Sequence, residues 1–265
     1  MSKKSDKDRY LVPGIVRGIE ILRLFSAEQR TLTAPEIAHA MDIPRSTVFR
    51  MAHTLEHLGL LERVDERNSF RLGIGVLTLG FEYLASLDMN EIARPSLEKL
   101  RDLSGLATHL VVRDGLDVVV ILKAPGRGAF SGGLSVGSRL PAHATVLGRV
   151  ILADLESEAL KALYRDQPLK RFSSQTPTTV AELETALAED RQRGYAVSES
   201  FFESGISAVA APVRDISGRV VGAINATALK AQDISEDLIA QVVLTADDIS
   251  RVLGCRPGLG RVVNL

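Results

Sequence analysis

The spacing of apolar residues predicts three helices within the first sixty positions. Residues 12–28 carry one helical stripe, formed by Ile15, Ile19, Leu22 and Phe25. Thr33 and Glu36 have the spacing of a capping box, so a second helix is predicted to begin after Thr33. A third helix is predicted from Pro44 to Gly59, because its apolar residues recur at helical spacing and are expected to face inward: Val48, Met51, Ala52, Leu55 and Leu58.

Polar residues gather at the start of the third predicted helix. A capped helix, a short turn at Asp42 and Ile43, and a second, longer helix follow the helix-turn-helix plan, in which the longer helix lies in the DNA major groove. The candidates for contacts with bases or phosphates are the polar residues of this segment: Thr33, Arg45, Ser46, Thr47, Arg50 and His53.

The pattern changes to short strands after position 60. Residues 61–64 and 69–72 read as two strands around a polar turn, which predicts a β-hairpin directly after the reading helix. Such a hairpin is a wing, so residues 1–73 are predicted to form a winged helix-turn-helix. Arg67 lies at the tip, where a wing touches phosphate or the minor groove. The alternative is that Arg67 and its neighbours Arg63 and Arg71 are simply solvated.

Two helical runs follow, at residues 73–87 and 90–105. The first is apolar and has little charge, so its stripe would be exposed in a monomer, and burial against a partner removes that cost. Residues 74–105 are therefore interpreted as a connector and dimerisation segment. The alternative is a core helix within one domain.

Residues 106–253 predict a second domain with helices on a mixed sheet. Asp114-Gly115 between two apolar runs is a strong hairpin signal, and Ser235 caps a final long helix. Further strands are expected at residues 134–136, 195–200, 206–215 and 219–229, and further helices at 145–155, 157–165 and 181–194. This domain has the size of a small-molecule sensor, and residues 254–265 are expected to be a flexible tail.

Composition narrows the class of protein. The chain has 265 residues and a net charge of −1, but residues 1–80 carry 12 Lys and Arg against 10 Asp and Glu, the sign expected for a DNA-binding N-terminal domain. No apolar run is long enough to span a bilayer, and the charged N-terminus lacks the apolar core of a secretory signal. A single cysteine, Cys255, excludes internal disulfides and fits the cytoplasm.

No motif for catalysis, cofactor or metal binding emerges. A Gly-x-Ser-x-Gly elbow is absent, and the Gly-rich residues 126–133 lack the Lys-Ser/Thr of a phosphate loop. His53 and His57 are four residues apart, but a solvated or DNA-facing surface is favoured over a metal site. The second domain is interpreted as a binder rather than an enzyme. His143 remains open between a donor to an acidic ligand and a structural cap.

The chain resembles the IclR family of bacterial transcription regulators over residues 12–253. The N-terminal part is similar in VRGIEILRLF, IPRSTVFRMAHTLEHLGLLER and the wing ending FRLG. The C-terminal part is similar in VGSRLPAHATVLGRVILADL, GYAVSESFFESGISAVAAPVRD and GRVVGAINATA. The resemblance implies an α+β fold, with the winged helix-turn-helix joined by a helix to a GAF-like α/β effector-binding domain. It also implies a homodimer or a dimer of dimers.

The resemblance further implies an effector pocket for a small organic acid, with no cofactor. Carried over by position, the pocket residues are Val146, Leu147, Ser198, Ala208, Asn225 and Thr227. Ser198, Ala208, Asn225 and Thr227 replace the acidic residue, cysteine and serines of members that bind glyoxylate or pyruvate, which counts against a two- or three-carbon keto acid. Residues 137–153 look closer to the branch that senses protocatechuate and hydroxybenzoate. Arg139 and His143 are the candidate partners of the acid, and His109 and Phe130 are candidate walls.

The expected function is a cytoplasmic transcription regulator that binds a double-stranded operator and responds to an organic acid, with no membrane association. Two alternatives from other classes stay open. One is an enzymatic GAF-type domain attached to a DNA-binding domain, and the other is an architectural DNA binder without a ligand. The sequence does not distinguish a repressor from an activator.

Overall fold

Contacts within the computed structural model divide the chain into two units, Met1–Ser86 and Leu87–Leu265. The structure describes residues 10–26, 28–64, 69–85, 88–127, 133–199, 205–229 and 234–255. The predicted boundary segment 74–105 is shared between the units, because its first helix belongs to unit 1 and its second to unit 2. Its role as a connector and dimerisation segment stays a prediction.

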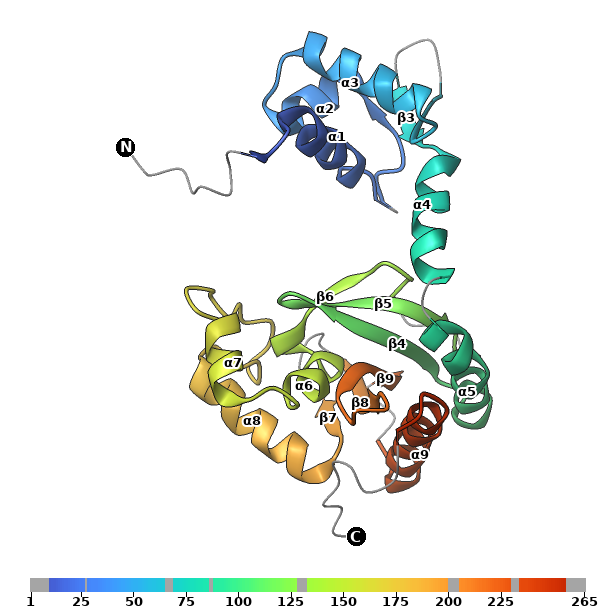
Figure 1. The fold of residues 1–265 in the computed structure, drawn as a ribbon, viewed down its shortest axis with the longest axis vertical. Coiled ribbons are helices and arrows are strands. Elements are labelled where there is room, and N and C mark those ends of the chain that lie inside the picture. Colours follow the sequence, from blue (N-terminus) through green and yellow to red (C-terminus); the bar gives the residue numbers. More distant parts are fainter. Residues whose placement is uncertain are drawn as a thin grey trace. The chain divides into compact units, whose positions relative to one another are not determined.

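Unit 1 contains the three predicted helices and the wing. In chain order its elements are α1 (Pro13–Arg23), β1 (Leu32–Thr33), α2 (Ala34–Met41), α3 (Arg45–His57), β2 (Leu61–Arg63), β3 (Ser69–Leu72) and α4 (Ile74–Ala85) (Figure 1). The capping box is confirmed: Glu36 N donates to Thr33 Oγ1, and Thr33 N donates to Glu36 Oε2. Asp42 makes the turn with a φ of 52°, and Gly59 ends α3 with a φ of 69°.

Strand β1 was not predicted from the sequence. It pairs antiparallel with β3 through Leu32 and Phe70, so the wing is part of a three-stranded sheet in the order β1-β3-β2. Phe70 is fully buried at this junction and packs in the same core as Val48 and Ala52 of α3. The wing is thus anchored directly to the helices.

Two expectations about the core of unit 1 were wrong. Ile21 and Phe25 are buried, whereas Ile15 is 66% exposed and Ile19 is also exposed. The apolar residues of α1 do gather on one side, but Ile15 and Ile19 on that side line an open groove with α3 rather than the core, and Phe25 lies beyond the end of the helix. Leu58 is 59% exposed, because α3 has already ended and it occupies the C-cap position.

Unit 2 alternates strands and helices. Its elements are α5 (Asp88–Ser104), β4 (Ala107–Asp114), β5 (Asp117–Ala124), β6 (Arg139–Pro141), the 3-10 helix η2 (Ala142–Ala144), α6 (Val146–Leu152), α7 (Ser157–Leu163), α8 (Val180–Arg193), β7 (Ala196–Glu199), β8 (Ile206–Arg214), β9 (Val220–Leu229) and α9 (Glu236–Val252). The predicted hairpin at Asp114-Gly115 and the Ser235 cap of α9 are both present.

The six-stranded sheet of unit 2 has the order β6-β5-β4-β9-β8-β7. Every pairing is antiparallel, so the expected mixed sheet was wrong. The strand expected at residues 134–136 was also wrong. The strand lies at Arg139–Pro141 instead, where it pairs with β5, and Gly137 turns the chain before it with a φ of 89°.

Helices cover both faces of this sheet. Helices α5 and α9 contact each other and the strands on one face, while α6 contacts β7, β8 and β9 on the other and is backed by α8 (Figure 1). The α6 side holds the largest apolar cluster, which includes Val150, Leu183 and Ala210. A buried bidentate ion pair between Arg149 and Asp190 joins α6 to α8.

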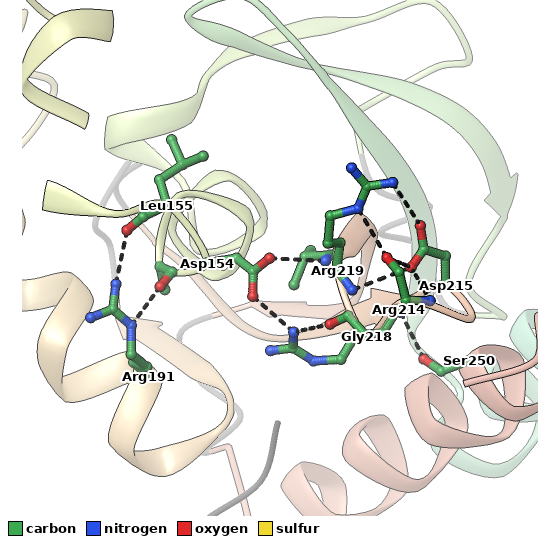
Figure 2. Close-up of polar contacts among 11 residues, drawn as sticks. Asp154, Leu155, Arg191, Arg214, Asp215, Gly218, Arg219 and Ser250 are labelled. Atoms are coloured by element: carbon green, nitrogen blue, oxygen red, sulfur yellow. Dashed lines mark hydrogen bonds and ion pairs between the residues drawn. The ribbon is translucent and has the colours of Figure 1, made fainter. Parts of the chain in front are cut away.

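A polar network fixes the far end of α6. The guanidinium of Arg214 in β8 donates to Asp154 Oδ1 at 2.8 Å and to the Gly218 carbonyl at 2.7 Å. The backbone N–H of Arg214 donates to Ser250 of α9, and Arg191 of α8 donates to two carbonyls that follow α6 (Figure 2). The network ties α6, α8, α9 and the β8–β9 turn together, so α6 is held firmly over the sheet.

The Gly148→Ala substitution is expected to destabilise unit 2. A Cβ at position 148 would lie 2.2 Å from the carbonyl oxygen of Ala142 and 2.3 Å from its Cα, so backbone must move. Overpacking of this kind costs about 1–3 kcal/mol, which outweighs the gain in helix propensity. Urea unfolding followed by circular dichroism measures the change. Gly14→Ala in α1 is the matched control, because its Cβ meets open space. Equal stabilities of the two variants would contradict this packing.

Candidate DNA-binding surface and effector site

The start of α3 presents the predicted polar residues to solvent. Arg45, Ser46 and Arg50 are exposed, Thr47 is half-buried, and the side chain of His53 is 71% exposed. The N-cap residue, Pro44, supplies no side-chain cap, so the first backbone N–H groups of α3 are not capped by a side chain. Uncapped N–H groups at a helix N-terminus, beside two arginines, form a site suited to a phosphate.

Thr33 is placed differently from the other candidates. Its hydroxyl donates to Glu36 Oε2 at 2.7 Å and accepts the backbone N–H of Glu36. Hydrogen bonds from the backbone and then the hydroxyl of Thr33 lower the pKa of Glu36. The structure therefore shows Thr33 as the cap of α2, the helix that supports α3.

The arginines of the wing are held by carboxylates of the same unit. Arg63 donates to both oxygens of Glu56 in α3, at 3.1 and 3.0 Å, and its guanidinium lies 5.0 Å from the centre of the Phe70 ring. Arg71 pairs with Glu62 across the hairpin at 2.7 Å. These contacts fix the wing against α3. Arg67 lies outside the described residues.

An apolar groove runs between α1 and α3. It has a volume of about 760 Å³ and is lined by residues that include Val12, Ile15 and Ile19 of the α1 side and Phe49 and Leu58 of the α3 side. All five are exposed. The sequence reasoning missed this groove because it assigned Ile15, Ile19 and Leu58 to the core. An exposed apolar surface of this kind is typical of a contact site.

In unit 2, four strands bring five predicted effector residues onto one face of the sheet. Ser198 of β7 lies opposite Ala208 of β8, which lies opposite Thr227 of β9. One step along the same face, Asn225 of β9 lies opposite His109 of β4. Directly paired residues share a face. This face packs against α6, because Ala210 and Ala223, the neighbours of Asn225 on it, belong to the apolar cluster under α6.

His109, Asn225 and Thr227 form a buried polar chain. Asn225 Oδ1 accepts the backbone N–H of His109 at 3.1 Å and lies 3.0 Å from His109 Nδ1. Asn225 Nδ2 donates to Thr227 Oγ1 at 2.9 Å. His109 is 0% exposed, and within the described parts of the chain its Nε2 has no hydrogen-bond partner. Buried polar groups without partners are rare in folded proteins.

The first turn of α6 packs on the same side of the sheet. Thr145 caps α6 by accepting the N–H of Gly148, and the next two residues, Val146 and Leu147, are 5% and 2% exposed. Both belong to the apolar cluster on this side of the sheet. The predicted effector residues of α6 and of the sheet are thus brought together.

Arg139 and His143 lie elsewhere. Arg139 is half-exposed and donates to Asp114 at 2.8 Å and Asp117 at 3.1 Å, at the turn between β4 and β5. His143 is buried in η2, and its Nε2 lies 3.0 Å from the carbonyl oxygen of Lys170. The structure thus gives both residues partners within the chain. Phe130 lies outside the described residues.

Lys123 is a candidate that sequence reasoning missed. It lies opposite His109 on the neighbouring strand β5, and its ammonium donates to the Leu134 carbonyl at 2.5 Å. A regular hairpin with the observed Asp114–Asp117 pair would place Leu122 opposite His109, but a bulge between Leu110 and Val111 shifts the register by one residue. This shift puts a positive charge beside the buried histidine.

The stability of unit 2 is expected to fall as the pH drops from 7 to 5. Burial, and to a lesser extent the charge of Lys123, lowers the pKa of His109 to about 4. An unfolded histidine takes up a proton near pH 6.5, so between the two pKa values the unfolded state binds more protons and is favoured. Through His109, the free energy of unfolding should fall by about 2 kcal/mol between pH 7 and pH 5.

Urea unfolding at the two pH values measures this effect. The His109→Gln variant should lose this part of the pH dependence, while His53→Gln, which changes an exposed histidine, should keep it. A wild-type slope that persists in His109→Gln would show that another group is responsible.

Two kinds of feature are absent from the residues that the structure describes. Among them, no group of three or more His, Cys, Asp or Glu side chains is placed to hold a metal ion. No described helix is both long and apolar enough to cross a membrane.

Comparison with known proteins identifies both units. The model of the IclR helix-turn-helix domain matches residues 14–65, and that of the C-terminal domain of the bacterial transcriptional regulator IclR matches residues 81–251. The Pca regulon regulatory protein of Pseudomonas putida is 32% identical over 219 residues, which are 82% of this chain and 75% of that protein. These matches are to transcriptional regulators, not to enzymes.

Solved structures support the same family assignment. The solved structure of a protein from Rhodococcus sp. RHA1 is 34% identical in sequence and has a TM-score of 0.81. The match covers 92% of this chain and 98% of that one. An IclR homolog from Microbacterium hydrocarbonoxydans, complexed with 4-hydroxybenzoate, has 25% identity and a TM-score of 0.80, covering 91% and 98%. Because both family models match in order and together span most of the sequence, the chain belongs to the IclR family of bacterial transcriptional regulators, with a DNA-binding helix-turn-helix domain before an effector domain.

Proposed function

We propose that this regulator acts in the cytoplasm and that a small organic acid, aromatic or ring-derived, controls its binding to an operator. The buried polar chain of His109, Asn225 and Thr227 carries the proposal. Polar side chains in an apolar core cost stability unless they are hydrogen-bonded, and His109 Nε2 is not bonded within the described residues. A chain of polar groups under α6 is therefore better explained by a ligand than by packing.

Two relatives and the residues placed around His109 support an aromatic or ring-derived acid. The 4-hydroxybenzoate complex is of a homolog with this fold, and a relative regulates the Pca regulon. In this chain the ammonium of Lys123 provides a positive charge beside His109 for a carboxylate. Apolar walls come from Val146 and Leu147, both buried at the start of α6. Ser198 and Ala208 complete the proposed site from β7 and β8.

On the DNA side, the proposed contacts are those of α3 and the wing. The first turns of α3 read bases or hold phosphates through Arg45, Ser46, Thr47 and Arg50. His53 and Arg67 extend the contact along the DNA backbone. The exposure of the α3 residues supports this assignment. Thr33 acts through the support that it gives to α2.

The protein is further proposed to bind as a homodimer, or as a dimer of dimers. A dimer places two α3 helices in successive major grooves of a pseudo-palindromic operator. Helix α4 exposes Ile74, Leu77 and Leu79, and a second copy of the chain would remove these side chains from water.

The Leu77→Asp substitution is expected to shift the protein toward the monomer in sedimentation equilibrium. A charge at this position would have to be buried in the α4 interface, and burying an unpaired charge is strongly unfavourable. The Val252→Asp substitution, at an exposed residue of α9, is the control. An unchanged mass for Leu77→Asp would remove α4 from the proposed interface.

A coupled DNA and ligand experiment tests the whole proposal. DNA selected by the wild-type protein from a random library supplies the operator. Aromatic and alicyclic acids are screened by thermal shift, and hits are retested in a gel shift with that DNA. At least one acid should raise the melting temperature and change DNA affinity about 5- to 150-fold, the usual range of coupling between sites. DNA binding that no acid alters would favour the architectural alternative, and turnover of a bound acid would favour an enzyme.

A further inference from the structure

The orientation of the Asn225 side-chain amide is fixed by a backbone group. The backbone N–H of His109 points at one atom of that amide, 3.1 Å away. A backbone N–H can only donate, so the atom that it faces must be the oxygen, Oδ1. The amide nitrogen then faces Thr227 Oγ1 at 2.9 Å, where it donates. A flipped amide would place two donors against each other.

This orientation fixes the position of the proton on His109. Nδ1 lies 3.0 Å from the same Oδ1, which accepts and cannot donate, so Nδ1 carries a proton. Burial lowers the pKa of His109 to about 4, so the ring is neutral near pH 7 and carries only that one proton. Nε2 therefore has a lone pair and no hydrogen.

Nε2 is thus an acceptor that needs a donor. It is fully buried and unpartnered within the described residues. A carboxylate has no hydrogen to give and would be repelled by the lone pair. A hydroxyl or an N–H group would satisfy the nitrogen. The positive charge of Lys123 lies on the adjacent strand, at the position paired with His109.

We propose that the effector is an acid that also bears a hydrogen-bond donor, most simply a hydroxyl, and that this group donates to His109 Nε2 while Lys123 balances the carboxylate. This inference rests on the proposed effector site and narrows its ligand from organic acids to hydroxy acids. His109 is then a specificity residue that selects for the hydroxyl, with Asn225 positioning its ring.

The tautomer is tested first, without any ligand. Nitrogen-15 NMR of histidine-labelled full-length protein distinguishes a ring protonated at Nδ1 from one protonated at Nε2. His109 should be protonated at Nδ1. His143 is the internal reference, because its Nε2 lies 3.0 Å from a carbonyl oxygen and must therefore be the protonated nitrogen. The His109→Gln spectrum assigns the signal. A proton on Nε2 of His109 would overturn the inference, whatever the protein binds.

A matched ligand series then tests specificity. The probes are 3- and 4-hydroxybenzoate, benzoate, and the corresponding methoxybenzoates, which keep the oxygen but lose the donor. A hydroxybenzoate should bind roughly 10- to 100-fold more tightly than its methoxy and unsubstituted partners, because those leave Nε2 buried without a bond. Equal affinities would overturn the hydroxyl inference while leaving an acid effector intact. No binding by any member would count against the proposed aromatic effector and against this inference.

A variant separates a direct role of the ring from a structural one. Asn225→Ala removes the acceptor that holds the proton on Nδ1, so the proton should redistribute toward Nε2 and the preference for hydroxyl over methoxy should shrink. The wild-type measurements keep the inference testable if this variant does not fold. A folded Asn225→Ala protein with an unchanged tautomer and unchanged preference would exclude Asn225 as the positioning residue and overturn the argument built on it.

Discussion

Replacing Arg149 by alanine is expected to lower the free energy of unfolding of unit 2 by about 3–5 kcal/mol. Arg149 of α6 donates to both oxygens of Asp190 in α8, at 2.7 and 2.6 Å, and the two side chains are 6% and 0% exposed. Burial raises the pKa of Asp190, and Arg149 opposes this effect. Without Arg149 a carboxyl group would remain in the core without the guanidinium that is bonded to both of its oxygens.

Urea unfolding of the full chain measures the loss. Arg193→Ala is the matched control, because Arg193 pairs with Glu189 on the exposed side of the same α8 helix and should contribute less than about 1 kcal/mol. The double variant Arg149→Met with Asp190→Leu should recover most of the stability, since neither charge is then buried. A single Arg149→Ala variant as stable as Arg193→Ala would show that the pair does not hold α6 to α8.

Replacing Arg50 by alanine is expected to weaken operator binding by about 10- to 100-fold. Arg50 lies on the exposed side of α3, one turn beyond Arg45 and Ser46. A base contact is worth about 1–3 kcal/mol of discrimination, which corresponds to a loss of this size. A contact to phosphate alone would instead weaken all sequences alike and reduce the salt dependence.

Gel shifts with selected and with scrambled DNA at several salt concentrations distinguish these two roles. Arg165→Ala in unit 2 removes the same charge from another exposed position and should leave affinity for both DNAs nearly unchanged. If Arg50→Ala binds selected DNA as tightly as the wild type at matched salt, Arg50 makes no operator contact.

The elements of unit 1 could be predicted because their signals are local. The capping box at Thr33 and Glu36, the turn at Asp42 and the positive φ of Gly59 each depend on residues within a few positions of one another. The inward face of α1 could not be predicted. Its apolar stripe lines an open groove beside α3 at Ile15, and only the packing of the unit 1 core decided that Ile21 is buried.

The hairpin, the helix caps and the later strands of unit 2 were likewise predicted from short patterns. The prediction of a strand at residues 134–136 was wrong, because an apolar stretch becomes a strand only where a neighbouring strand is free to hydrogen-bond with it. The edge of β5 is occupied instead by Arg139–Pro141. The family pattern supplied the positions of the proposed effector residues, but not their chemistry or their partners.

The sequence alone determined which residue types are available: a reading helix that begins with Arg45 and Ser46, and an effector domain containing His109 and Asn225. Only the tertiary structure decided what His109 can do. The bulge in the β4–β5 pair placed Lys123 rather than Leu122 opposite it. A backbone N–H on β4 oriented the amide of Asn225 on β9, and that amide set the position of the ring proton. Register and proton position depend on contacts between strands far apart in sequence, so no local pattern encodes them.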